Sequence, residues 1–155
     1  MPVTGLNHAV LYVRDVETTR EFYENVLGFT TLMWMPGQAA FFRAPGSTND
    51  HDLGTFQIGS GAGPSGAGRS TVGLYHLAWE VDTLGELDRL RTVLAERGAL
   101  VGMSDHGTTK SLYAHDPDGI EFEVLWTVPR DSWGNLEHEA ITQRLDLDAE
   151  LARWG

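Results

Sequence analysis

Two stretches of this sequence decide the predicted fold: Leu6-Asn7-His8-Ala9-Val10-Leu11-Tyr12-Val13 and Leu74-Tyr75-His76-Leu77-Ala78. Each places a histidine inside an apolar, strand-like run, and each is followed by a helical pattern of similar length. A strand–helix unit that recurs with histidine at the same position is typical of an internal duplication. We therefore expect the two imidazoles to occupy related places in one fold.

The first half of the chain predicts one strand, one helix and three further strands. A strand over residues 6–13 is followed by a helix from an N-cap at Asp15 to about Leu27, and Gly28 suits the C-terminal position. The buried stripe of this helix is predicted to contain Val16, Thr19, Phe22, Tyr23 and Val26. Pro-Gly turns separate the next strands, which we expect at residues 29–35, 39–43 and 53–58.

The second half repeats this order after a glycine-rich connector, residues 59–68 (GSGAGPSGAG). A strand over 74–81 precedes a helix that begins with the capping box Thr83-Leu84-Gly85-Glu86 and ends at Gly98. The turn Asp116-Pro117-Asp118-Gly119 predicts that the last two strands form a hairpin. The strands of this half are expected at 100–103, 111–115 and 121–126.

These patterns predict an α+β fold made of two tandem βαβββ modules, at about residues 4–59 and 70–127. We expect the modules to form a curved, partly closed mixed sheet around a metal site, within a single domain over residues 1–128. Residues 129–155 form a polar C-terminal tail with scattered Leu and Trp. We expect this tail to pack as a short helix or arm on the body or on a second subunit.

The composition excludes several classes of function. The sequence has no cysteine, which rules out disulfides, zinc-cysteine sites and thiol chemistry. A formal net charge of −11 at pH 7 argues against nucleic acid or an anionic membrane surface as a partner. No apolar run is long enough to span a membrane, and Met1-Pro2-Val3-Thr4-Gly5 lacks the features of a signal peptide. We therefore expect a cytoplasmic protein.

The two repeated histidines and a late carboxylate make a candidate metal site. His8 and His76 occupy matching positions, and Glu121 and Glu123 lie on one face of the last strand because strand side chains alternate. Two imidazoles and one carboxylate suit a divalent ion and leave coordination positions open. Spacing alone does not choose between the two glutamates. Taken singly, a strand histidine is more often a hydrogen-bonded core residue, and a strand-end glutamate is usually solvated.

The module order, the strand openings and the ending Asp116-Pro117-Asp118-Gly119-Ile120-Glu121-Phe122-Glu123 resemble the vicinal-oxygen-chelate superfamily. This group includes glyoxalase I, extradiol dioxygenases, and fosfomycin and bleomycin resistance proteins. The resemblance covers residues 6–126. In the family's ending motif the ligand is the glutamate four positions after the turn glycine. The resemblance therefore implies His8, His76 and Glu123 as the metal ligands.

Three further residues are similar to those of the ring-cleaving extradiol dioxygenases. His51 opens a His-Asp-Leu segment, His106 lies in a His-Gly segment, and Tyr113 stands ten residues before Glu123. The resemblance implies that His51 is an acid–base histidine, and that His106 and Tyr113 are catalytic as well. The stretch between His106 and Tyr113 is slightly shorter here than in longer family members.

The resemblance implies an Fe(II)-dependent dioxygenase, with Mn(II) as the alternative ion, that cleaves a catechol-type diol with O2. An imidazole can take up and return a proton near neutral pH, as deprotonation of a catechol requires. The implied partners are a small aromatic diol and O2, with neither nucleic acid nor a membrane. A homo-oligomer, a dimer or higher, is also expected.

Two other functions remain open at this level. A glyoxalase-like lyase or isomerase would use a second Glu or Gln on the strand at 53–58, where Gln57 is the one conceivable substitute. A metal-free drug-binding protein would have no need of His8, His76 and Glu123 together. The intact set of three therefore favours an enzyme.

Overall fold

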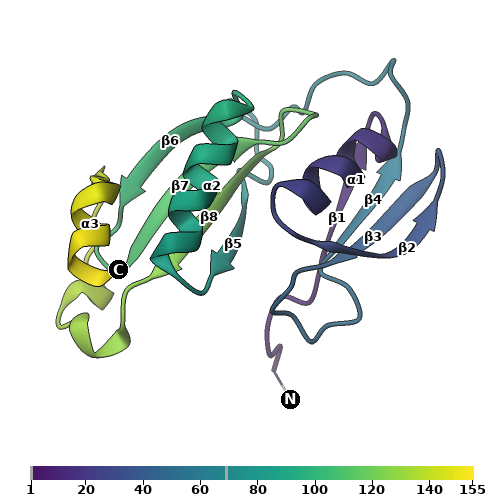
Figure 1. Ribbon diagram of the computed structural model, residues 1–155. Helices are drawn as coiled ribbons and strands as arrows, with labels where there is room; N and C mark the ends of the chain where they lie inside the picture. The colour runs from purple at the N-terminus through teal and green to yellow at the C-terminus, as the bar shows by residue number, and fades with distance from the viewer. Residues whose placement is uncertain (1, 69) are drawn as a thin grey trace. The chain divides into compact units, whose positions relative to one another are not determined.

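The computed structural model describes residues 2–68 and 70–155. The chain divides into two compact units: unit 1 ends at Ser65, and unit 2 runs from Gly66 to Gly155 (Figure 1). Each unit contains one βαβββ module. Within the described ranges, no helix has the length and apolar content needed to cross a membrane.

Unit 1 is a four-stranded mixed sheet with one helix on its face (Figure 1). The strand order is β1-β4-β3-β2, in which β1 and β4 are parallel and the other pairs are antiparallel. The elements are β1 (Ala9–Val13), α1 (Val16–Asn25), β2 (Thr30–Met35), β3 (Ala39–Arg43) and β4 (Leu53–Gln57).

The helix of unit 1 begins and packs as the sequence predicts. The Asp15 side chain accepts a hydrogen bond from the Thr18 backbone N–H at 2.7 Å, which caps the helix. Gly28 has a φ of +72°, the left-handed conformation that glycine tolerates beyond a helix end. The buried side is the predicted stripe, Val16, Thr19, Phe22, Tyr23 and Val26.

Unit 2 is a five-stranded mixed sheet in the order β5-β8-β7-β6-β9. The strands β5 and β8 are parallel, and the remaining pairs are antiparallel. Helix α2 lies across one face of the sheet, and α3 lies beside it (Figure 1). The elements are β5 (Leu77–Val81), α2 (Leu84–Glu96), β6 (Leu100–Asp105), β7 (Thr109–His115), β8 (Glu121–Thr127), β9 (Gln143–Arg144) and α3 (Leu147–Trp154), with 3₁₀ turns at Arg130–Ser132 and Leu136–His138.

Helix α2 also follows its sequence signals. Thr83 caps it by accepting a hydrogen bond from the Glu86 N–H at 3.2 Å, and Gly98 follows its end with a φ of +67°. Its buried side consists of Leu84, Leu87, Leu90 and Leu94. Val93, next to Leu94, is half-buried.

The predicted α+β class with two βαβββ modules is confirmed. Each module forms its own sheet, and the sheets are not closed into a barrel. The tail belongs to unit 2, where β9 extends the sheet at β6 and α3 packs on α2. Several bounds differ from the sequence prediction: α1 ends at Asn25, and β6 and β7 are longer than expected. His8 and His76 each stand one residue before their strand, because the ladders begin at Ala9 and Leu77.

Candidate functional site

The hairpin of β7 and β8 places Tyr113 directly opposite Glu123. The turn between the strands is closed by the Asp116 side chain, whose Oδ1 accepts from the N–H groups of Asp118 and Ile120 at 2.9 Å each. Gly119 supplies the left-handed residue that this turn needs, with a φ of +81°. The ten-residue spacing of tyrosine and glutamate is therefore a direct cross-strand pair.

His76 joins this pair because β5 runs parallel to β8. Leu77 is in register with Phe122, so the residue before β5 lies beside the start of β8. The Nε2 atom of His76 lies 3.1 Å from Oε2 of Glu123, and its Nδ1 atom lies 3.8 Å from Oε1 of Glu121. Both predicted carboxylates thus contact the same imidazole, one at each ring nitrogen.

The His76–Glu123 pair has features of two ligands of one metal ion. Glu123 is only 7% exposed, and a buried carboxylate is costly unless a cation or hydrogen bonds compensate for lost hydration. Two donors that each lie about 2.1 Å from one ion at a right angle are about 3.0 Å apart. The observed 3.1 Å therefore suits either a hydrogen bond or a shared ion.

The His76–Glu123 pair is not yet a complete metal site. The Nδ1 atom of His76 has no hydrogen-bond partner in the part of the chain that the structure describes. Within residues 2–68 and 70–155, no group of three or more His, Asp or Glu is arranged to hold an ion. A metal centre at this pair needs a further donor.

His106 stands in a tight turn between β6 and β7. Asp105 accepts from the Gly107 N–H at 2.7 Å, and Gly107 has a φ of +79°. A Cβ atom at Gly107 would lie 3.1 Å from Cδ1 of Ile141, so the space for a side chain is already filled. The His-Gly pair thus reflects a local backbone requirement as well as chemistry.

Both ring nitrogens of His106 have partners. Nδ1 lies 2.8 Å from the backbone carbonyl oxygen of Ile141, and Nε2 lies 2.8 Å from the hydroxyl of Tyr113. Burial, followed by the negative charge of Glu123, raises the pKa of Tyr113 to about 12. Tyr113 therefore keeps its proton at neutral pH.

His106 and Tyr113 line an open cavity of about 450 Å³ in unit 2, a volume that suits a small ligand. His106, Tyr113 and Glu121 form its polar wall, together with residues that the sequence did not single out as pocket residues: Tyr75, His115 and Thr142. Thr142 comes from the tail. The sequence carries no signal for it, because the tail reaches the cavity only through tertiary packing.

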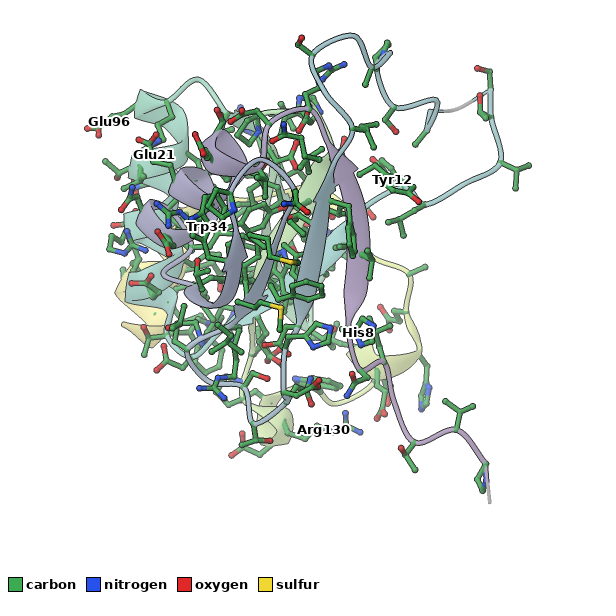
Figure 2. The ribbon with its side chains drawn as sticks, turned by 90° about the vertical axis from the view of Figure 1, so that its right-hand side faces the viewer. His8, Tyr12, Glu21, Trp34, Glu96 and Arg130 are labelled. Atoms are coloured by element: carbon green, nitrogen blue, oxygen red, sulfur yellow. The ribbon has the colours of Figure 1, made fainter. Side chains whose placement is uncertain are left out.

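Unit 1 brings together the other two predicted histidines. The rings of His8 and His51 lie with centroids 4.3 Å apart, and the ring of Phe41 meets His51 edge-on at 5.3 Å. His51 Nδ1 lies 2.9 Å from an Asp50 carboxylate oxygen. Figure 2 shows His8 at the start of β1 and Tyr12 farther along, on the side of the sheet away from α1.

A buried carboxylate, Asp52, shapes the loop that carries His51. It accepts hydrogen bonds from the Ala44 N–H at 2.8 Å, the Ser47 hydroxyl at 2.7 Å and the Asn49 amide at 2.8 Å. Burial alone would raise the pKa of Asp52, but these hydrogen bonds outweigh it and lower the pKa. The charged side chain thus holds the loop in place.

The structure therefore groups the predicted site residues in two sets. Unit 2 brings together His76, His106, Tyr113 and Glu123, and unit 1 brings together His8 and His51. The ligand set of His8, His76 and Glu123 draws on both units and stays a prediction.

Comparison with known proteins identifies the family of the chain. The model of the Glyoxalase/Bleomycin resistance protein/Dioxygenase superfamily matches residues 5–124. The chain belongs to this superfamily. The matched range contains the first βαβββ module and the second as far as the middle of β8, and it leaves the tail outside.

The chain is similar to proteins named as dioxygenases and to solved structures of this fold. It is 32% identical to a catechol-2,3-dioxygenase of Bacillus subtilis, over 98% of the chain and 53% of that protein. It is 29% identical to biphenyl-2,3-diol 1,2-dioxygenase 3 of Rhodococcus globerulus, over 88% of the chain and 72% of that protein. The chain thus spans about half the length of the Bacillus relative. A glyoxalase/bleomycin resistance protein/dioxygenase domain from Frankia sp. EAN1pec shares the fold, with a TM-score of 0.68, 22% identity, and coverage of 89% of this chain and 100% of that one.

Proposed function

We propose that this protein is an Fe(II)-dependent extradiol dioxygenase, which cleaves the ring of a catechol-type diol with O2. The observation that carries the proposal is the arrangement in unit 2. There the hydrogen-bonded residues His106 and Tyr113 line a cavity next to the His76–Glu123 pair. The two dioxygenase relatives, which are named for aromatic diols, support the same substrate class.

We propose His76, Glu123 and His8 as the residues that hold the iron. His76 Nε2 and Glu123 Oε2 already lie 3.1 Å apart. The Nδ1 atom of His76 has no hydrogen-bond partner among the described residues, and it faces Glu121 at 3.8 Å. His8 is included because it occupies the matching position of the other module. Bound Fe(II) would hold the diol and dioxygen together and pass electrons between them, which is the redox chemistry that side chains alone lack.

The remaining residues would handle protons. His51 faces Asp50 with Nδ1, so its Nε2 is available to take a proton from a diol hydroxyl and to return it later. Tyr113 keeps its own proton, and its hydroxyl lies 2.8 Å from Nε2 of His106, so its oxygen can also accept a hydrogen bond from the substrate. His106 would hold the Tyr113 hydroxyl in place through their hydrogen bond.

Oxygen uptake by the metal-loaded protein tests this proposal. The protein is purified anaerobically, loaded with Fe(II), assayed for iron content, and supplied with catechol or biphenyl-2,3-diol in an oxygen electrode. We expect oxygen consumption together with a yellow ring-opened product. Iron bound in a 1:1 ratio without oxygen uptake on any diol of a broad panel would refute the dioxygenase assignment.

A further inference from the structure

The C-terminal tail is packed onto unit 2 by strand pairing and by buried leucines. Its short strand β9 pairs with β6 at Ser104–Arg144 and Asp105–Gln143. Leu145 and Leu147, on either side of the α3 N-cap, are 2% and 1% exposed. Burial of this kind opposes release of the segment into solvent.

Charged groups add to this anchoring. Lys110 of β7 is 4% exposed, and its ammonium group lies 2.6 Å from Asp105 and 3.5 Å from Glu150 of α3. The Trp154 indole N–H also donates to Glu150, at 3.0 Å. The ammonium group therefore links the His106 turn, which Asp105 shapes, to the last helix of the chain.

This anchoring brings a backbone carbonyl of the tail to His106. The Ile141 carbonyl oxygen lies 2.8 Å from Nδ1 of the ring. A carbonyl can only accept, so Nδ1 must carry hydrogen. In the neutral ring Nε2 then has a free lone pair, which accepts from the Tyr113 hydroxyl at 2.8 Å.

We propose that the tail is a positioning element of the cavity, in which the Ile141 carbonyl fixes His106 as the Nδ1–H tautomer and so makes its Nε2 the acceptor for Tyr113. The catalytic meaning of this contact rests on the proposed function, but the tautomer itself does not. When a substrate hydroxyl gives its proton to the Tyr113 oxygen, Tyr113 passes its own proton to Nε2. The products are a substrate oxyanion, a neutral tyrosine and a His106 imidazolium.

The same carbonyl also suits the charged ring. Both N–H groups of the imidazolium have acceptors, the Ile141 carbonyl at Nδ1 and the Tyr113 oxygen at Nε2. With the tail released, Nδ1 would face water, and both neutral tautomers would be populated. In the Nε2–H tautomer, Nε2 cannot accept the proton of Tyr113.

Nitrogen NMR of the full-length, metal-free protein tests the tautomer directly. The histidines are labelled with 15N, His106 is assigned by its absence in His106→Gln, and spectra are taken at a pH where the ring is neutral. We expect a pyrrole-like Nδ1 and a pyridine-like Nε2. The reverse pattern, or rapid averaging of the two, would overturn the proposal whether or not the protein is a dioxygenase.

A variant with a loosened tail tests whether the tail fixes the His106 tautomer. In Leu145→Ala/Leu147→Ala we expect faster amide exchange in β9 and a mixed His106 tautomer. Leu53→Ala removes a buried leucine from unit 1 instead, and it should leave the tautomer unchanged. Thr142→Val should also leave it unchanged, because the Thr142 hydroxyl lies farther from Nδ1, at 3.4 Å. An unchanged tautomer with a demonstrably released tail would overturn the role of Ile141, and a change in Thr142→Val would assign it to the hydroxyl.

Steady-state kinetics separates this inference from the proposed function. In the iron-loaded double alanine variant we expect kcat to fall by about tenfold, while KM changes by less than about twofold. This loss is smaller than the roughly 100-fold or more typical of a deleted acid–base group, because part of the His106 population keeps Nε2 free. A kcat equal to that of the wild type would overturn the positioning role. Absence of turnover in the wild type would refute the dioxygenase assignment and leave the NMR result standing.

Discussion

The turn before β8 contains a carboxyl group whose burial should cost stability at neutral pH. Asp116 is 5% exposed, and its Oδ1 accepts two backbone hydrogen bonds. Its Oδ2 atom has no hydrogen-bond partner among the residues described by the structure. Burial raises the pKa of Asp116 from its ordinary value of 3.8 to about 6, against the effect of the hydrogen bonds from Ile120 and Asp118.

We predict that Asp116→Asn stabilises the protein at pH 7 to 8. An asparagine Oδ1 can accept the same two hydrogen bonds without placing a charge in the turn. Because the folded state holds the proton more tightly than the unfolded chain, the free energy of unfolding of the wild type falls as pH rises from about 4 to about 6. At about 1.4 kcal/mol per pKa unit, the loss amounts to about 3 kcal/mol.

Urea denaturation followed by tryptophan fluorescence, repeated from pH 4 to pH 8, measures this effect. The advantage of Asp116→Asn should be small at pH 4, grow through pH 6 and level off above it. Asp131→Asn, at an exposed position, is the matched control and should change stability by less than about 0.5 kcal/mol. A stability difference that does not vary with pH, or that favours the wild type at pH 8, would refute the reasoning.

Four other substitutions test the site and its support. His76→Ala should abolish iron retention by metal analysis, whereas His138→Ala, at an exposed histidine of the tail, should retain it; equal iron in both would refute the ligand assignment. His51→Ala should bind iron but lose about 100-fold or more in kcat, and an unchanged rate would place this histidine outside catalysis. Tyr113→Phe should also keep iron and lower kcat, and it should remove the hydroxyl partner of His106 in the NMR experiment. Lys110→Met breaks buried ion pairs and should lower the free energy of unfolding by about 3 kcal/mol in urea; a loss below 1 kcal/mol would contradict this.

Local signals carried most of the fold prediction. The helix caps at Asp15 and Thr83 and the left-handed glycines after the helix ends, Gly28 and Gly98, are decided by neighbouring residues, and all four are observed. The burial of α1 follows directly from the spacing of its apolar residues. These features need no knowledge of the rest of the chain, because capping and periodicity act within a few residues.

Part of the candidate site could be predicted for the same reason. Once the Asp-Pro-Asp-Gly turn is recognised, hairpin register alone places Tyr113 opposite Glu123. The position of His76 beside this pair depends on the parallel pairing of β5 with β8, which the structure shows and the sequence analysis did not predict. The choice between Glu121 and Glu123 did not follow from spacing, since both lie on the face that contacts this histidine.

The sequence by itself determined the two modules, their helix caps and the cross-strand pair at the centre of the candidate site. Only the tertiary structure decided that Lys110 is buried, that the tail joins the sheet of unit 2, and that the Ile141 carbonyl meets His106. The physical reason is range. Caps, turns and hairpin register depend on residues close in sequence, whereas the contact between residues 106 and 141 exists only after β9 and α3 have packed. Because every residue has a backbone carbonyl, the sequence cannot show which carbonyl will contact His106.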